Sequence, residues 1–130
     1  MPLARISLHR GKPAAHLAAI RDGIYAALRE TFDVPENDRF MLITQHDADE
    51  FDYSPSYLNI ARSDDLVMIQ ITVSNTRSIA KKQALYRRIV ERLSDNPGLR
   101  PEDVLINLVE VLPEDWSFGN GRASYVEASG

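Results

Sequence analysis

The order of the predicted secondary-structure elements constrains the fold most strongly. Apolar residues spaced three and four apart predict helices over residues 14–32 and 79–93. Each predicted helix lies between two mostly apolar segments of strand length, which are residues 3–9, 39–46, 66–74 and 103–111. The order strand, helix, strand therefore occurs twice, and a parallel strand pair joined by a helix forms a right-handed βαβ unit. We expect one domain over residues 1–130, with halves at about 2–47 and 66–111.

Two such units side by side predict an α+β fold, a duplicated βαβ with a four-stranded mixed sheet and two helices on one face. The strands are largely apolar on both faces, so the bare face needs a second layer, which another copy of the chain would supply most simply. We expect a homo-oligomer, with a C-terminal tail strand at residues 122–126 that pairs across a subunit boundary. Residues 47–65 are predicted as a long loop with at most a short strand at residues 58–60, and loops of this length are often functional.

The composition excludes several functional classes. The 130 residues contain no cysteine, which excludes disulfides, thiolate metal ligands and cysteine nucleophiles. The net charge of −4 argues against a nucleic-acid partner, because binding to phosphates requires a basic surface. No apolar run approaches the ~20 residues that span a bilayer, and the charged residues near the N-terminus do not fit a signal peptide. We expect a cytoplasmic protein without a membrane partner.

Pro2 is the first candidate for chemistry. It directly follows the initiator methionine, which aminopeptidases usually remove when the next residue is small. The freed secondary amine would titrate at about 7.7 to 8.0 in a model peptide. Such an amine serves as a general base or acid near neutral pH. The alternative is that Pro2 is merely a common second residue.

Further motifs occur in order along nearly the whole chain. Together with Pro2 they are Val34-Pro35-Glu36-Asn37-Asp38-Arg39-Phe40, Gln45-His46, Arg62-Ser63, Thr76-Arg77-Ser78 with Lys82 and Tyr86, and Asp115-Trp116-Ser117-Phe118-Gly119-Asn120-Gly121. With this set the chain resembles the tautomerase superfamily, and within it the branch that contains malonate semialdehyde decarboxylase. The Asp-Trp-Ser-Phe-Gly run is the most specific part. The resemblance implies a duplicated βαβ fold, a trimer and a catalytic amino-terminal proline.

The resemblance also implies roles for individual residues. Pro2 is the catalytic amine, and Arg77 grips a substrate carboxylate through two parallel hydrogen bonds. Asp38 is catalytic and lies near the proline, where it orients Pro2 or stabilises its charged form. Arg39 is a candidate substrate contact, or a structural partner of Asp38 in the turn. The decarboxylase has a second arginine at the position of Asn75, which can still donate a hydrogen bond but carries no positive charge.

Trp116 and Phe118 are separated by one residue and so face the same side of an extended segment. They form either the apolar wall of a substrate pocket or an oligomer contact. His46 is the best-placed histidine, although a lone histidine is more often structural. No spaced set of His, Asp and Glu indicates a metal, and no glycine loop indicates a phosphate-bearing ligand. We therefore expect neither a metal nor a cofactor.

These residues predict an enzyme that acts on a small carbonyl compound bearing a carboxylate. The leading hypothesis is keto–enol tautomerisation of a 2-oxo acid such as phenylpyruvate, with Pro2 as general base and acid. The alternative reaction is decarboxylation of a 3-oxo acid of the malonate semialdehyde type, which requires a protonated Pro2. The missing arginine at Asn75 favours the tautomerase. A non-catalytic oligomeric binding module is the third hypothesis, since a retained Met1 would make the Pro2 nitrogen an amide.

Overall fold

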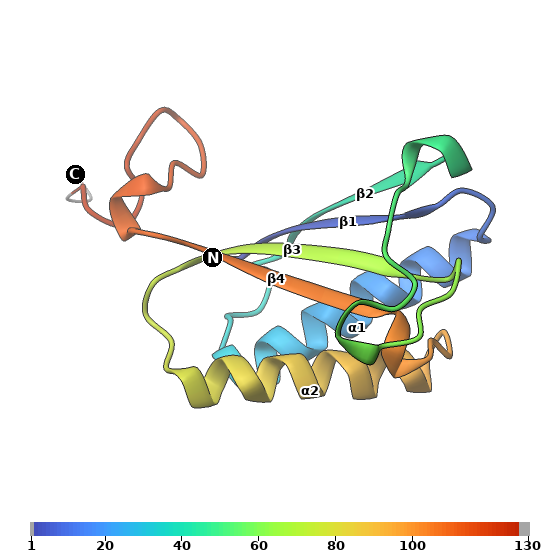
Figure 1. Ribbon diagram of the computed structural model, residues 1–130. Helices are drawn as coiled ribbons and strands as arrows, with labels where there is room; N and C mark the ends of the chain where they lie inside the picture. The colour runs from blue at the N-terminus through green and yellow to red at the C-terminus, as the bar shows by residue number, and fades with distance from the viewer. Residues whose placement is uncertain (1, 128–130) are drawn as a thin grey trace.

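The computed structural model describes residues 2–127, which form two helices packed on a four-stranded sheet (Figure 1). In chain order the elements are β1 (Leu3–His9), α1 (Ala14–Phe32), β2 (Phe40–His46), β3 (Val67–Ser74), α2 (Ile79–Asp95) and β4 (Val104–Val111). The sheet order is β2-β1-β3-β4. The pairs β1–β2 and β3–β4 are parallel, and the central pair β1–β3 is antiparallel. The predicted duplicated βαβ fold and mixed sheet are confirmed.

Local residues explain where the helices begin and end. Pro13, with φ of −69°, precedes α1 and suits a helix start, and α1 ends before Asp33, whose φ of 55° is left-handed. The Ser78 hydroxyl caps α2 by accepting a hydrogen bond from the Lys81 backbone N–H at 3.2 Å, as its position predicts. The second helix continues two residues past the predicted end, to Asp95.

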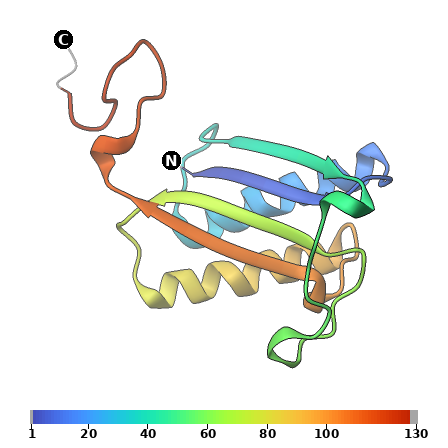
Figure 2. The same ribbon diagram turned by 45° about the horizontal axis from the view of Figure 1, so that its top comes forward.

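The core lies between one face of the sheet and the two helices, which cover the same side of it (Figure 2). Its residues come from alternate positions of the central strands and from one side of each helix. All of the following are at most 2% exposed: Ala4, Ile6, Leu8, Val67, Ile69, Ile71, Val73, Ile20, Ile24, Leu28, Leu85, Ile89 and Leu93. The helices approach closely, because Gly23 of α1 has no side chain where Leu93 packs, and Glu30 of α1 binds both Arg88 and Arg92 of α2.

The opposite face of the sheet is uncovered in the single chain. It exposes the apolar residues Phe40, Leu42, Leu105 and Val109, at 37–48% of their surfaces. Polar residues alternate with them across the strands, among them Arg5, Gln70 and Asn107. The prediction of a bare face is confirmed, although this face is more polar than the sequence suggested.

The C-terminal segment differs from the prediction. Residues 122–126 form turns instead of a tail strand. Asn120 and Gly121 have φ of 59° and 67°, and the Val126 N–H donates to the Ala123 carbonyl at 3.0 Å, so the chain bends back on itself. This segment projects beyond the end of the sheet next to the N-terminus (Figure 1).

The loop between β2 and β3 also lacks the expected short strand. Its regular elements are two 3-10 turns, Ala48–Glu50 and Tyr57–Asn59, and left-handed backbone at Leu58 (φ 61°) prevents an extended segment there. The end of the loop is held by Asp103, which is fully buried and accepts hydrogen bonds from the Ser63 N–H at 2.7 Å and the Ser63 hydroxyl at 2.6 Å. Within residues 2–127, neither helix is long and apolar enough to cross a membrane.

Candidate active site

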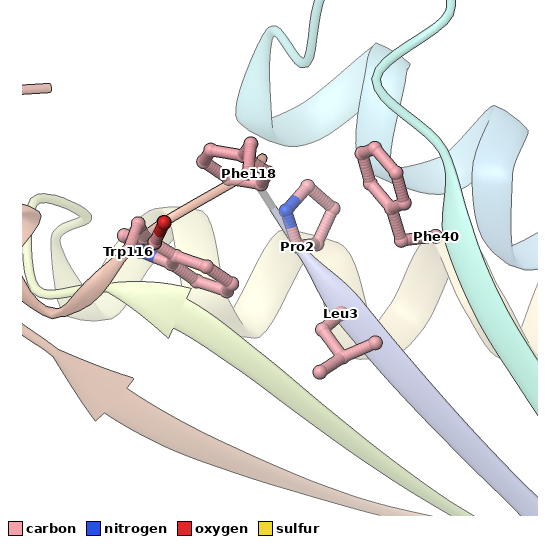
Figure 3. Close-up of a pocket in the computed structure, with 6 residues that line it drawn as sticks. Pro2, Leu3, Phe40, Trp116 and Phe118 are labelled. Atoms are coloured by element: carbon pink, nitrogen blue, oxygen red, sulfur yellow. The ribbon is translucent and has the colours of Figure 1, made fainter. Parts of the chain in front are cut away.

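A cavity of about 220 Å³ lies where the start of β1 meets the C-terminal segment. Its lining consists of Pro2, Leu3, Phe40, Trp116, Ser117 and Phe118. Figure 3 shows the ring of Pro2 between Phe40 on one side and the Trp116–Phe118 pair on the other, with the proline nitrogen on the side of that pair. Pro2 is buried, and most of its neighbours are apolar. The cavity therefore surrounds the one backbone nitrogen that the sequence singled out.

The aromatic side chains of the cavity contact one another. The rings of Trp116 and Phe118 are stacked, with centroids 5.1 Å apart and an interplanar angle of 10°. Phe118 also lies 5.8 Å from Phe40 and packs edge-on against Tyr125 at 5.4 Å. Two residues separated by one position thus face the same side, as predicted, and we call the stacked pair Trp116 and Phe118 the aromatic wall.

Hydrogen bonds hold the aromatic wall in place. The indole N–H of Trp116 donates to the Ser74 hydroxyl oxygen at 3.0 Å. Ser124 supports the backbone on both sides of Ser117: the Phe118 N–H donates to its hydroxyl oxygen at 3.0 Å, and its own N–H donates to the Trp116 carbonyl at 3.3 Å. The aromatic wall is therefore attached to the end of β3 through Ser74 and to the following C-terminal turn through Ser124.

Arg77 lies near the aromatic wall but does not line the cavity. Its guanidinium donates to the Phe32 carbonyl at 2.9 Å and to the Thr76 hydroxyl at 3.0 Å, and its central carbon lies 4.9 Å from the centroid of the Phe32 ring. Burial raises the pKa of Tyr125, and the positive charge of Arg77 opposes that rise. Tyr125 thus feels the charge of Arg77 and packs against the ring of Phe118.

The other predicted site residues are not among those that line the cavity. Asp38 is half-buried in the turn before β2, two residues from Phe40, and its backbone N–H donates to the Pro35 carbonyl at 3.2 Å. The exposed Asn75 follows β3, and its backbone N–H donates to Val111 at 2.8 Å.

Arg39 turns toward α1. It forms an ion pair with Asp22, and its guanidinium carbon lies 4.8 Å from the centroid of the Tyr25 ring. Both the substrate contact and the turn pair with Asp38 remain predictions, and the contacts described here join Arg39 to α1. His46 bonds to the Thr44 hydroxyl at 3.1 Å and packs near Phe51 at the opposite end of β2 from Phe40.

Sequence reasoning missed Phe40 and Leu3 as cavity residues. Their proximity could have been inferred in part from the predicted strands. Leu3 and Phe40 both begin their strands and are partners in the parallel pairing of β1 with β2. Ser74, Ser124 and Tyr125 were also missed. Their contacts with the aromatic wall join residues that are distant or lie in an irregular turn, for which a single sequence carries no periodic signal.

No group of three or more His, Asp and Glu side chains within residues 2–127 is arranged to hold a metal ion. The site instead offers a buried proline, an aromatic wall and a nearby guanidinium. When the proline nitrogen is a free amine, this set suits proton transfer on a small organic acid.

Comparison with known proteins shows the family of the chain. The family described as "Tautomerase enzyme" matches residues 38–119. The probable tautomerase YusQ of Bacillus subtilis is 41% identical over 127 residues, which cover 98% of this chain and 100% of YusQ. A crystal structure of malonate semialdehyde decarboxylase, from a study of its decarboxylase and hydratase activities, superimposes with a TM-score of 0.90 at 32% identity and covers 95% of both chains. FG41 malonate semialdehyde decarboxylase, inhibited by 3-bromopropiolate, gives a TM-score of 0.89 at 35% identity, covering 95% of this chain and 94% of that one. The chain belongs to the tautomerase family.

Proposed function

We propose that the chain, once Met1 is removed, uses the amine of Pro2 as general base and acid in the keto–enol tautomerisation of a small 2-oxo acid such as phenylpyruvate. The observation that carries the proposal is the burial of Pro2 in a small cavity lined mainly by apolar and aromatic side chains. An amine in such surroundings loses part of its hydration, which disfavours the charged form and keeps it a base near neutral pH.

The reaction requires one proton to leave carbon and one to reach oxygen. The neutral Pro2 amine takes a proton from the carbon next to the carbonyl, and the electron pair of the broken C–H bond moves toward the carbonyl oxygen. That oxygen then accepts a proton from the protonated amine, which gives the enol and restores the amine. The reverse direction uses the same steps, so one nitrogen serves as base and acid in turn.

The residues around Pro2 bind and orient the substrate. Arg77 binds the substrate carboxylate: a guanidinium has five N–H donors, and within residues 2–127 the bonds to Thr76 and Phe32 engage two of them. The aromatic wall and Phe40 contact the apolar part of the substrate, which favours an aryl or alkyl 2-oxo acid. Asp38 orients Pro2, and Asn75 offers a further donor at the end of β3.

Decarboxylation of a 3-oxo acid is the second candidate function. Two structures of malonate semialdehyde decarboxylase at 32% and 35% identity favour it. In that reaction a protonated Pro2 would polarise the carbonyl oxygen while the C–C bond to the carboxylate breaks and carbon dioxide leaves. Asn75 in place of a second arginine leaves less positive charge at the site, and this favours the tautomerase. Carbon dioxide release from malonate semialdehyde distinguishes the two.

We further propose that the protein is a homo-oligomer, with a trimer as the expected form, because the open sheet face exposes Phe40, Leu42, Leu105 and Val109. Light scattering after size-exclusion chromatography measures the assembly. A monomer at micromolar concentration would contradict this part of the proposal.

The test of the main proposal compares three forms of the protein in an enol-to-keto assay with phenylpyruvate. Intact mass first verifies that Met1 is absent. Wild type is expected to be active, Pro2→Ala to lose most of its kcat/KM, and Pro13→Ala, which removes an exposed proline at the start of α1, to match wild type. Equal rates for wild type and Pro2→Ala would overturn the proposal. A Met1 that is retained in the natural protein, or a protein without Met1 that is inactive toward every carbonyl acid tested, would support the non-catalytic binding module.

A further inference from the structure

Ser74 is a buried hydroxyl that the proton-transfer scheme does not use. It ends β3, is 1% exposed, and its hydroxyl oxygen accepts the indole N–H of Trp116 at 3.0 Å. We propose that Ser74 is a positioning residue, which fixes the orientation of the Trp116 ring and thereby the aromatic wall that faces Pro2. The proposal deepens the function proposed above and rests on it for its kinetic consequence.

The two ends of this hydrogen bond differ in rigidity. Ser74 belongs to a strand that pairs with β4, and Ser74 itself is the register partner of Val111. Trp116 belongs to an irregular segment that leaves the sheet after β4 and projects from the body of the molecule (Figure 2). The bond therefore anchors a side chain of the projecting segment to the sheet, over a separation of 42 residues in sequence.

The anchored ring in turn determines the position of the next one. Trp116 and Phe118 are nearly parallel, at 10°, and Phe118 is 39% exposed in the single chain. If the indole rotates about its side-chain bonds, the stacked partner loses the surface on which it lies. The cavity would then lose the side that faces the proline nitrogen in Figure 3.

A residue with this role affects substrate binding more than proton transfer. The aromatic wall contacts the substrate before and during the reaction alike, so its disorder removes binding that is equal in both states. Ser74→Ala is expected to raise KM for phenylpyruvate by about fivefold, the factor that a net hydrogen bond contributes. It is expected to leave kcat within about twofold of wild type.

The chain contains a single tryptophan, so the indole N–H resonance in a 15N-correlated NMR spectrum reports Trp116 alone. In wild type the indole proton is expected to exchange slowly with water. In Ser74→Ala it is expected to exchange much faster and to shift, because its acceptor is gone. An indole resonance with unchanged position and exchange rate in Ser74→Ala would overturn the proposal, and this result does not depend on any activity.

The kinetic test uses a double-mutant cycle with Trp116→Phe, which lacks the indole N–H. The increase in KM caused by Ser74→Ala is expected in the wild-type background and not in the Trp116→Phe background. The same increase in both backgrounds would show that Ser74 does not act through Trp116 and would overturn the proposal. Ser74→Thr, which keeps the hydroxyl, is expected to restore the KM and the slow exchange.

A matched control removes a hydroxyl elsewhere. Ser94 is half-buried near the C-terminal end of α2, at the opposite end of the molecule from Pro2, and Ser94→Ala is expected to change neither KM nor the indole resonance. Thermal unfolding checks that each variant is folded. If Ser74→Ala does not fold, Ser74→Cys keeps the size of the side chain with only a weak acceptor and carries the same tests. If wild type has no tautomerase activity, the function proposed above fails, and the exchange data still decide whether Ser74 anchors the ring.

Discussion

Arg77 offers the most informative single perturbation, because its side chain has both a structural and a proposed binding role. The guanidinium donates to the Phe32 carbonyl at the end of α1 and lies 4.9 Å from the centroid of the Phe32 ring. Arg77→Ala removes both contacts, together with the proposed grip on the substrate carboxylate. The two roles predict different measurements and so can be separated.

The structural loss follows from the two contacts to Phe32. A hydrogen bond from a charged donor contributes about 1.5 kcal/mol or more, and a cation over an aromatic ring at a partly exposed site contributes about 0.5 kcal/mol. We therefore expect Arg77→Ala to lower the free energy of unfolding by about 2 kcal/mol, as measured by urea denaturation. Arg29→Ala, which removes an arginine 5.9 Å from the centroid of the Tyr25 ring, is the matched control and is expected to cost less.

The functional loss follows from the missing carboxylate contact. Charge-assisted bonds to a carboxylate are roughly twice as strong as neutral ones, so kcat/KM for phenylpyruvate is expected to fall about a hundredfold in Arg77→Ala. Arg77→Lys keeps the positive charge but lacks the two parallel N–H donors of a guanidinium. Its kcat/KM for phenylpyruvate is therefore expected to fall less, by about tenfold. The kcat/KM of both variants is measured at a temperature at which thermal unfolding shows that they are folded.

A substrate without a carboxylate separates binding from folding. Phenylacetaldehyde has the carbon skeleton of phenylpyruvate with hydrogen in place of the carboxylate. Wild type and Arg77→Ala are expected to enolise it at similar, low rates. A folded Arg77→Ala protein with wild-type kcat/KM for phenylpyruvate would refute the reasoning, and so would an equal loss toward both substrates.

Three further predictions concern the scaffold. Asp103→Ala, which leaves both donors of Ser63 without their buried acceptor, is expected to lower the free energy of unfolding by about 3 kcal/mol; a loss below about 1 kcal/mol in urea denaturation would contradict this. The two arginines of α2 that bind Glu30 lower its pKa from the ordinary value of 4.5. The stability advantage of wild type over Glu30→Gln is therefore expected above pH 4.5 and is lost as the pH falls through the lowered pKa. A difference in Tm between the two proteins that is constant from pH 7 to 3 would contradict this prediction. Gly23→Ala would place its Cβ 2.9 Å from the fully buried Leu93 side chain, and the cost of overpacking, about 2 kcal/mol, exceeds the gain of about 1 kcal/mol in helix propensity; a raised Tm would contradict that balance.

The regular part of the fold was predictable because its signal is local. The helical spacing of Ile20, Ile24 and Leu28 defines the buried side of α1, and its predicted bounds of 14–32 match the structure. The apolar run of β3 and the Ser78 cap of α2 could be predicted equally directly from the local sequence. The twofold order of elements then limited the ways in which four strands combine.

The irregular part was not predictable, because its conformation depends on contacts between distant residues. Arg39 forms an ion pair with Asp22 and lies over the ring of Tyr25, both in α1, and no local sequence pattern indicates these contacts. The C-terminal segment contains β-branched and aromatic residues that suggest a strand, yet left-handed backbone at Asn120 and Gly121 turns it back. Propensity over five residues is a weak guide beside such turn chemistry.

Part of the lining of the candidate site was predictable from the sequence, and its boundaries were less so. Pro2, Trp116 and Phe118 line one cavity, in agreement with the motifs that carried the family resemblance. Phe40 joins them through strand register. The roles of Asp38, Asn75 and Arg77 toward a substrate remain predictions that the variants above test.

The proposed tautomerisation depends on the chemical state of the Pro2 nitrogen, which can be measured directly. In protein labelled with 15N-proline and verified by intact mass, the Pro2 resonance is followed from pH 5 to 10. We predict a free secondary amine whose pKa lies below the model-peptide range of about 7.7 to 8.0, because the apolar cavity disfavours the protonated form. A Pro2 nitrogen that is still an amide to Met1, or an amine that stays protonated to about pH 9, would contradict the proposed tautomerase.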